Sequence, residues 1–357
     1  MRPADTTREE IFRLSADAEL RRRFLIVNEH IPGNFRMGVL LEMLDRFAGM
    51  TAVDFVRRTI PDARVVTAAL DEVVVRAVAD PERDVRCRAR INRVGRSSME
   101  VGVRVEQLPE ETHLATCYFT MVVLAPDGSA ERAARLEPFE PDDEVGRQRV
   151  RRAEARRDAY RREQAQAFAP PSAEEFQLIA RLYREQEVPG FAGLPARQVV
   201  AETWERTYPE QENPWKIIFG GFIMRRAYEL SAICADFVAT HRPVLAAVNR
   251  VNFVRPVQIG DKLHLTSRVV YTAGPAICVE TAIERQSRDR QSRALSNSCL
   301  FTFVNVDPGL APQDVPRIYP GSHGEEQRYL AARRNLRHLT SRTTSGWLAG
   351  LLPEPRY

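Results

Sequence analysis

The sequence predicts an α+β protein in which one unit, a helix followed by antiparallel strands, occurs twice. Three observations predict this fold. The chain has 357 residues, and single cores seldom grow beyond about 250 residues, so two domains are expected. An apolar helical pattern recurs after a long interval, and alternating apolar and polar strand patterns follow each copy. The composition, 44% hydrophobic and 28% charged, is that of ordinary globular domains.

Two segments that begin with a glycine carry the helical pattern. Gly38 begins GVLLEMLDRFAGMTAVDFV, and Gly221, 183 residues later, begins GFIMRRAYELSAICADFV. In both segments apolar residues recur at the three- and four-residue spacing of a helix, and both end in a similar VDFV or ADFV stretch. We therefore expect one central helix in each half.

Strand patterns follow each helix in the same order. A strand rich in small and β-branched residues comes first, TAALDEVVV from Thr67 and LAAVNRVNF from Leu245. Two alternating strands come next, with Gly95 and Gly274 at the expected hairpin turns. Each half closes with nearly the same strand, CYFTMVVLAPDG or CLFTFVNVDPG. Each half should thus hold one antiparallel sheet.

The segments outside these units complete the expected domain organisation. We expect an N-terminal extension, a first domain, a charged helical linker, a second domain and a C-terminal tail, over residues 1–24, 25–130, 131–200, 201–308 and 309–357. In the linker, the arginine-rich run 147–163 could bind nucleic acid or phosphate, but interleaved acids and missing aromatic platforms favour a solvated connector helix. Ser172 and Glu175 have the spacing of a capping box that begins a second linker helix.

Composition argues against several other classes. A net charge of +4, with Lys216 and Lys262 the only lysines, gives little reason to expect a nucleic-acid partner. The five cysteines and six histidines show no CxxC or HExxH spacing, so we expect no metal and no cofactor. Residues 1–23 mix acids with arginines and lack a signal-peptide core, and no stretch approaches the ~20 apolar residues of a membrane span. We therefore expect a cytoplasmic protein with no membrane partner.

The most informative stretch is NPWKIIFGGFIM, from Asn213 to Met224. It resembles the N-x-x-x-x-x-F-G-G-x-x-M signature of hotdog acyl-CoA thioesterases. The resemblance implies two hotdog domains in tandem, each a sheet wrapped around its helix, that hydrolyse acyl-coenzyme A. Pairing the two sheets side by side would also protect their edges. The stretches RMG with LD at residues 36–38 and 44–45, VGRSSMEV at 94–101 and IYP at 318–320 resemble the acyl-CoA thioesterase 9 subgroup.

The residue types suit thioester chemistry. Gly220 and Gly221 would let the substrate approach a helix N-terminus, whose unpaired N–H groups can stabilise an oxyanion. The resemblance implies a carboxylate seven residues after the glycine, which is Asp45 in the first half, whereas the second half has Tyr228 followed by Glu229.

Helical spacing separates the two acids. Asp45 shares its face with apolar neighbours, so burial should raise its pKa toward that of a useful base. Glu229 has Arg225 and Arg226 beside it, which is typical of a solvated salt bridge. Asp45 could act as general base or as nucleophile, or could be a buried carboxylate that only satisfies backbone groups.

The second site residue comes from the other half. Asn213 lies eight residues before Gly221, where the first half has His30, which we expect to be a loop histidine, and Asn34 is out of register. The resemblance implies one composite site with Asn213 from one domain and Asp45 from the other, and therefore one degenerate site.

Further residues and alternatives stay open at this point. The resemblance implies contacts to coenzyme A from Arg96, Ser97 and Ser98, although these residues could equally be an ordinary hairpin turn. A hydratase or dehydratase using His30 with Asp45 is one alternative, weakened because no Asp-x-x-x-x-His motif is present. A non-catalytic acyl-CoA-binding protein is another. Related proteins assemble as trimers of domain pairs, so a homo-oligomer is possible, while the acyl-chain preference is not readable.

Overall fold

The computed structural model describes residues 6–71, 73–125, 135–136, 141, 143–167, 169–249 and 251–342. The first half contains α1 Ala18–Phe24, α2 Met37–Val56, β1 Arg8–Phe12, β2 Arg64–Leu70, β3 Val73–Val75, β4 Val85–Val94, β5 Ser98–Gln107 and β6 Thr112–Leu124. The second contains α5 Gly220–Asp236, β8 Val200–Arg206, β9 Arg242–Val248, β10 Val251–Asn252, β11 Lys262–Ala273, β12 Ala276–Gln286 and β13 Arg293–Val306. The remaining elements are α3 Glu144–Ala167, α4 Ala173–Gln186, α6 His323–Arg342, β7 Leu194–Pro195 and β14 Ile318–Tyr319.

The two central helices, α2 and α5, form where the sequence predicts them, each one residue before the expected glycine. Their apolar faces are buried against the sheet of their own half. The buried side chains are Val39, Leu40, Leu41, Leu44 and Phe47 in α2, and Ile223, Met224, Ala227, Leu230 and Cys234 in α5. Burial of each such side chain stabilises the fold by roughly 1.5–3 kcal/mol. This burial stabilises both helices, whose N-cap residues make no side-chain hydrogen bond to the helix.

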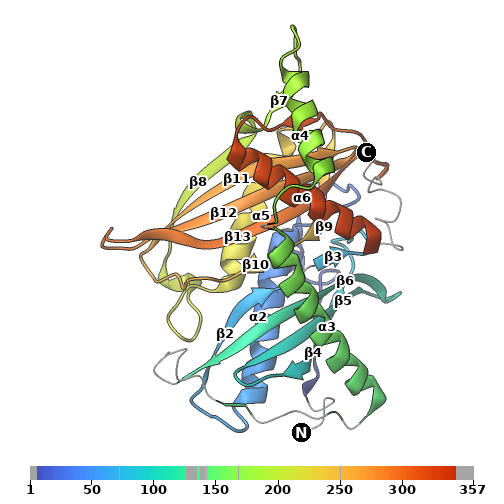
Figure 1. Ribbon diagram of the computed structural model, residues 1–357. Coiled ribbons are helices and arrows are strands. Elements are labelled where there is room, and N and C mark those ends of the chain that lie inside the picture. The colour runs from blue at the N-terminus through green and yellow to red at the C-terminus, as the bar shows by residue number, and fades with distance from the viewer. Residues whose placement is uncertain are drawn as a thin grey trace.

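The strands of both halves form one continuous antiparallel sheet in the order β1-β4-β5-β6-β3-β9-β13-β12-β11-β8. The halves join where β3 pairs with β9, with Val73 opposite Val248 and Val74 opposite Ala247. A second junction pairs β10 with β2. Side-by-side pairing therefore protects an edge of each unit, as the sequence led us to expect. The fold is a double hotdog, with α2 and α5 on one face of the shared sheet (Figure 1).

The first strand of each unit is divided, which the sequence pattern did not indicate. The predicted strand from Thr67 is β2 followed by β3, and the predicted strand from Leu245 is β9 followed by β10. The division matters because β3 and β9 pair with each other, while β2 pairs with β10. Each half therefore contributes one piece to each of the two junctions.

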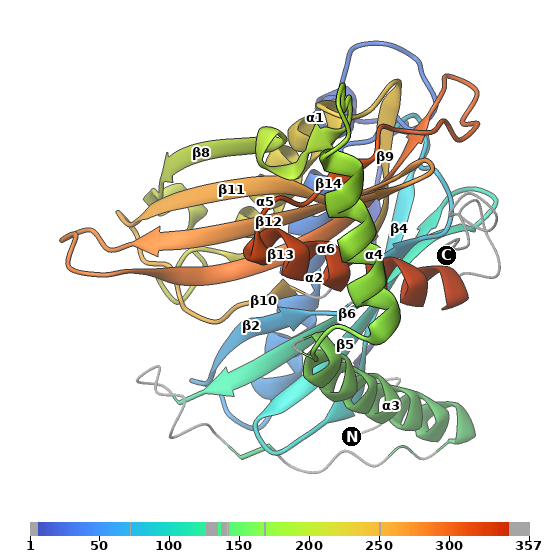
Figure 2. The ribbon, with the colours of Figure 1, turned by 45° about the horizontal axis from the view of Figure 1, so that its top comes forward.

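The opposite face of the sheet carries α3, α4 and α6 (Figure 2). The arginine-rich run is the helix α3, as predicted, and α4 begins with the predicted capping box of Ser172 and Glu175. Residues 309–342 are more ordered than a tail, because α6 buries Leu336 and Leu339 and stacks Tyr329 edge-on against Tyr271 at 4.9 Å. Apolar residues at helical spacing in this segment were the overlooked signal.

Two further findings bear on the classes considered above. Within the described part of the chain, no helix is long and apolar enough to cross a membrane. In that same part, no three His, Cys, Asp or Glu side chains gather closely enough to hold a metal ion. All five cysteines are buried and unbridged.

Candidate active site

Asp45 is fully buried and lies where α2 meets the start of α5. A Cβ atom added to Gly220 would lie 3.3 Å from Asp45 Oδ2. The carboxylate of the first half therefore faces the first turn of the central helix of the second half. The structure thus places Asp45 close to Gly220 and Gly221.

The two carboxylate oxygens of Asp45 differ in their partners. Thr67 Oγ1 on β2 donates a hydrogen bond of 2.7 Å to Oδ1. Oδ2 accepts no hydrogen bond from the residues that the structure describes. The Gly221 amide is close enough to favour the ionised form, although its geometry does not close a hydrogen bond to Oδ2. One oxygen is thus held in place while the other is available to a reacting group.

The environment of Asp45 suits proton transfer near neutral pH. The pKa of this carboxyl is raised to about 6, mainly by burial and to a smaller extent by the nearby charge of Glu42. The Thr67 hydroxyl and the Gly221 amide act in the opposite direction because they stabilise the charged form. A base is most useful when its pKa lies close to the working pH, so Asp45 is well matched to abstract a proton.

Close packing between the two central helices requires glycine at the start of α5. A Cβ atom at Gly221 would lie 2.8 Å from the backbone oxygen of Glu42 and 3.0 Å from its Cα, so any larger residue would push the helices apart. A Cβ atom at Gly220 would touch the ring of Phe253 at 3.1 Å. Phe219, the N-cap residue, makes no side-chain cap, so the first-turn amides keep their donors for a ligand.

Asn213 lies in the loop that leads into α5. Its Oδ1 accepts hydrogen bonds from the backbone of Trp215, at 2.9 Å, and of Ile217, at 3.4 Å. Its Nδ2 makes no hydrogen bond to any residue in the described ranges, so the side chain is shaped by its own loop and presents a donor. Trp215 Nε1 in turn donates to the backbone oxygen of Val65 at 3.0 Å.

The Trp215 contact brings this loop onto the first half. Val65 is two residues from Thr67 on β2, and Thr67 holds Asp45. The Asn213 loop of the second half and Asp45 of the first half are therefore both held by β2. Among the described residues, no hydrogen bond joins Asn213 to Asp45.

The predicted coenzyme A contacts lie in the hairpin between β4 and β5. The Gly95 amide closes this turn on Ser98 at 2.7 Å, and Arg96 is exposed. Ser98 pairs with Val122, which pairs with Val66 on β2. The turn is thus two strands, or roughly 10 Å, from β2, the strand whose Thr67 donates a hydrogen bond to Asp45. It does not touch the carboxylate, and it borders the same end of the sheet.

The equivalent position in the other half is filled by an aromatic ring. A Cβ atom at Gly38 would lie 2.7 Å from Tyr228 Cδ1, so Tyr228 faces the start of α2 as Asp45 faces the start of α5. Tyr228 is buried and packs with Phe301 and Phe303, at ring distances of 6.0 and 6.1 Å. Burial raises the pKa of its hydroxyl, which keeps it neutral.

The neighbouring acid is committed to a salt-bridge network. Glu229 pairs with Arg225 at 3.0 Å, with Arg226 at 2.6 Å and with Arg36. The predicted salt bridge is correct, but the prediction of a solvated surface is wrong because the Glu229 side chain is only 17% exposed. The contact between α2 and α5 covers it.

The first half has no counterpart of Asn213 at this position. The His30 side chain is 78% exposed and faces Glu82, as expected of a loop histidine. Asn34 is buried and uses its amide entirely within its own loop, where it accepts from Ile26 and Val27 and donates to Val27 and Glu29.

Three residues at the site were not identified from the sequence. Thr67 orients Asp45, Phe253 packs on Gly220, and Glu42 contacts Gly221 through its backbone and pairs with Arg225 at 3.0 Å. Thr67 and Phe253 sit in ordinary strand patterns, so nothing local marks them.

Comparison with known proteins concerns the family and the fold of the chain. A family model described as the thioesterase superfamily matches residues 35–112 and 216–291. Acyl-coenzyme A thioesterase 9, mitochondrial, of Homo sapiens is 28% identical, over 96% of this chain and 80% of the human protein. Acyl-coenzyme A thioesterase 4, mitochondrial, of Humulus lupulus is 30% identical, over 92% of this chain and 66% of the plant protein.

One solved structure supports the arrangement of the whole chain. A putative oleoyl thioesterase from Lactobacillus plantarum matches with a TM-score of 0.51 at 8% identity, over 84% of this chain and 96% of that chain. This likeness concerns the fold alone. The two matches to the family model show that the chain carries the thioesterase superfamily domain twice. Its similarity over nearly the full length assigns it to the double hotdog acyl-coenzyme A thioesterases that resemble thioesterase 9.

Proposed function

We propose that this protein hydrolyses acyl-coenzyme A to a free acid and coenzyme A at one composite site between its two hotdog domains. The observation that carries the proposal is the buried Asp45 carboxylate, with a pKa of about 6, against the uncapped first turn of α5. A base and an oxyanion-stabilising helix end come from different halves of the chain. Such a pair supplies the two elements that thioester hydrolysis requires.

The proposed reaction begins with the thioester carbonyl over the start of α5. The carbonyl oxygen accepts from the amide of Gly221, which stabilises the negative charge that develops there. Oδ2 of Asp45 takes a proton from water as the water oxygen bonds to the carbonyl carbon. The C–S bond then breaks and the proton passes to the departing thiolate. Asn213 Nδ2 orients the thioester or the water, and Arg96, Ser97 and Ser98 contact the coenzyme A portion.

Asp45 could instead attack the carbonyl carbon and form an anhydride that water then cleaves. A single turnover in ¹⁸O-labelled water detects an anhydride that water cleaves at the Asp45 carbonyl, because Asp45 then gains the label and the first acid product carries an unlabelled oxygen from the protein. Direct attack by water and cleavage of an anhydride at its acyl carbonyl both place the label in the acid product. The mass of the intact protein during turnover separates these two, since only the anhydride adds the acyl group to the chain.

Release of free thiol from acyl-coenzyme A, followed with a thiol reagent, tests the function. The Asp45→Asn variant should lose at least about 10³-fold in kcat, because removal of a base and its charge costs several kcal/mol in the barrier. Asp54→Asn is the matched control, since Asp54 lies on the same helix with its side chain 61% exposed. Full activity of Asp45→Asn would refute the assignment.

The two alternatives give different results in the same assay. A hydratase or dehydratase would alter the acyl chain and release no thiol, and the exposed position of His30 does not favour it. A non-catalytic binding protein would bind acyl-coenzyme A saturably without releasing thiol. A screen across short, medium, long and branched chains would at the same time establish the acyl preference.

We further propose a cytoplasmic location and a trimer of double hotdogs, both from the sequence reasoning above. Relatives are named as mitochondrial proteins, so fractionation of cells that express a tagged full-length chain is the required test of location. Native mass measurement tests the assembly. A monomer across the micromolar range would overturn the trimer.

A further inference from the structure

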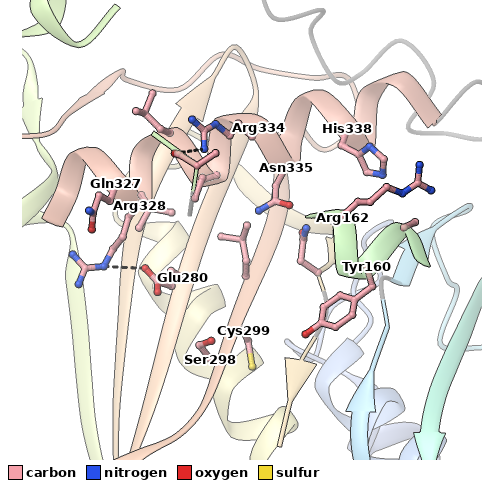
Figure 3. A pocket seen from close by; sticks show the side chains of 18 of the residues that line it. Tyr160, Arg162, Glu280, Ser298, Cys299, Gln327, Arg328, Arg334, Asn335 and His338 are labelled. Carbon is pink, nitrogen blue, oxygen red and sulfur yellow. Dashed lines mark hydrogen bonds and ion pairs between the residues drawn. The ribbon is translucent and has the colours of Figure 1, made fainter. Parts of the chain in front are cut away.

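A large cavity among the described residues lies on the face of the sheet away from Asp45. It has a volume of about 1500 Å³ and is walled by the sheet, α3, α4 and α6 (Figure 3). Glu280 on β12 faces it, while the adjacent Thr281 points to the other face and contacts Ser231 of α5 within hydrogen-bond distance. The sheet therefore separates this cavity from the candidate active site.

The three helices that wall the cavity come from parts of the chain outside both matched thioesterase domains. The family matches cover residues 35–112 and 216–291, whereas α3, α4 and α6 occupy 144–167, 173–186 and 323–342. The cavity is thus an addition to the two hotdog units, and hydrolysis at Asp45 gives no reason for it.

The charges in the cavity are unevenly balanced. Six arginines line it, and three of them pair with glutamates: Arg156 with Glu100, Arg328 with Glu280 and Arg334 with Glu175. The other three, Arg76, Arg152 and Arg162, have no carboxylate partner in the part of the chain that the structure describes. All three come from the first-half side, after β3 or on α3, where Asp71 is the only carboxylate that lines the cavity in the described ranges. Arg152 and Arg162 are roughly 15 Å apart along α3, so one anionic group can meet one of them but not both. The first-half side therefore offers guanidinium groups to an anion.

The second-half side adds apolar side chains beside the ion pair of Arg328 and Glu280. The apolar ones are Val270 and Leu300 of the second-half sheet, Leu330 of α6 and Ile179 of α4. Phe176, also a lining residue, is 70% exposed. In Figure 3, Asn335 of α6 and Tyr160 of α3 point into the space above Ser298 and Cys299. The cavity combines an apolar floor with an anion-binding end.

We propose that this outer cavity binds an amphipathic anion, an extended hydrocarbon chain that carries a negative charge at one end. The charged end lies on the first-half side, against Arg76 and Arg152, and the chain extends along Leu300 toward α6. Two molecules share this chemistry, a long-chain fatty acid and an acyl-coenzyme A. The proposal does not depend on the chemistry at Asp45.

A photoreactive 16-carbon fatty acid with a diazirine in its chain tests the proposal. The full-length Asp45→Asn variant is used as the background so that no thioester can be consumed. After illumination, peptide mapping should find the probe on α3, α4 or α6. Labelling only at α2 and α5 would overturn the proposal, because it would mean that the chain enters the hotdog site alone.

A double substitution should weaken this labelling at least tenfold. In the Phe176→Glu, Arg152→Glu variant, the first change removes an apolar lining side chain and the second reverses the charge that faces the anionic end of the ligand. Val188→Glu with Arg181→Glu is the matched control, with a similarly exposed apolar residue and an exposed α4 arginine that do not line the cavity. Equal loss in the control, or no loss in the cavity variant at an unchanged melting temperature, would refute the site.

Competition identifies the source of the ligand. Displacement by palmitate but not palmitoyl-coenzyme A indicates the free acid, and the reverse indicates the thioester. Palmityl alcohol lacks the charge and should compete at least tenfold less well. Equal competition by the alcohol would refute the role of the arginines, and failure of both anions to compete would refute the proposal.

Discussion

The hydroxyl of Thr67 should control the pH at which the enzyme becomes active. It donates to Asp45 Oδ1 at 2.7 Å, and this hydrogen bond stabilises the ionised carboxylate. A hydrogen bond to a charged group is worth about 1.5–3 kcal/mol, and one pKa unit corresponds to about 1.4 kcal/mol. Replacing Thr67 by Val should therefore move the pKa of Asp45 from about 6 to roughly 7–8.

The direction of the pH effect depends on which form of Asp45 is active. The ionised carboxylate is the base, so activity rises with pH through the pKa of Asp45. With the pKa raised by the Val substitution, less of the enzyme is ionised at pH 6, and kcat should fall there by about 5- to 50-fold. Near pH 9 both proteins are ionised, and the loss should be small.

The assay is thiol release from acyl-coenzyme A across pH 5–9, with kcat fitted at each pH. Thr67→Ser should restore the original profile because it restores the hydroxyl. Thr51→Val is a control, since Thr51 is a buried hydroxyl of α2 that donates to Phe47 of its own helix at 2.9 Å. A loss of activity equal at all pH values would show that Thr67 supports only the packing, and it would refute the role of its hydroxyl in setting the pKa of Asp45.

Three further predictions concern the same region. Asp45→Asn should stabilise the fold by up to about 3 kcal/mol at pH 7, measured by denaturant unfolding. Burial raises the pKa of Asp45 from 3.8 to about 6, so the unsubstituted protein loses stability as the pH rises through that window, and the Asn variant does not. If the variant gains no stability over the unsubstituted protein at pH 7 relative to pH 3.5, the prediction is contradicted. Gly221→Ala should destabilise the fold by about 1–3 kcal/mol and lower kcat, because the added methyl group meets Glu42. Gly49→Ala is the control, and it should stabilise the fold by about 0.5–1 kcal/mol because the space around Gly49 is open. Tyr228→Phe should leave kcat within about twofold if only the Asp45 site works, because a neutral, buried hydroxyl supplies no base; a loss as large as that of Asp45→Asn would contradict a single site.

The sequence by itself determined the duplicated unit, because helical and strand periodicities are local properties of the chain. It also selected Asp45 over Glu229, since neighbours three and four residues away define a helix face without any tertiary information. The glycines at 220 and 221 and the helix that follows them were equally readable.

Tertiary structure alone decided which distant groups surround the carboxylate. Thr67, Phe253 and the backbone of Glu42 meet at the site only because α2 and α5 pack together and β2 pairs with β10. It also showed that Glu229 is covered, because the contact between the helices, not local spacing, removes it from solvent. The outer cavity is of the same kind, since α3 and α4 of the linker and the distant α6 enclose it only after the two halves have joined into one sheet.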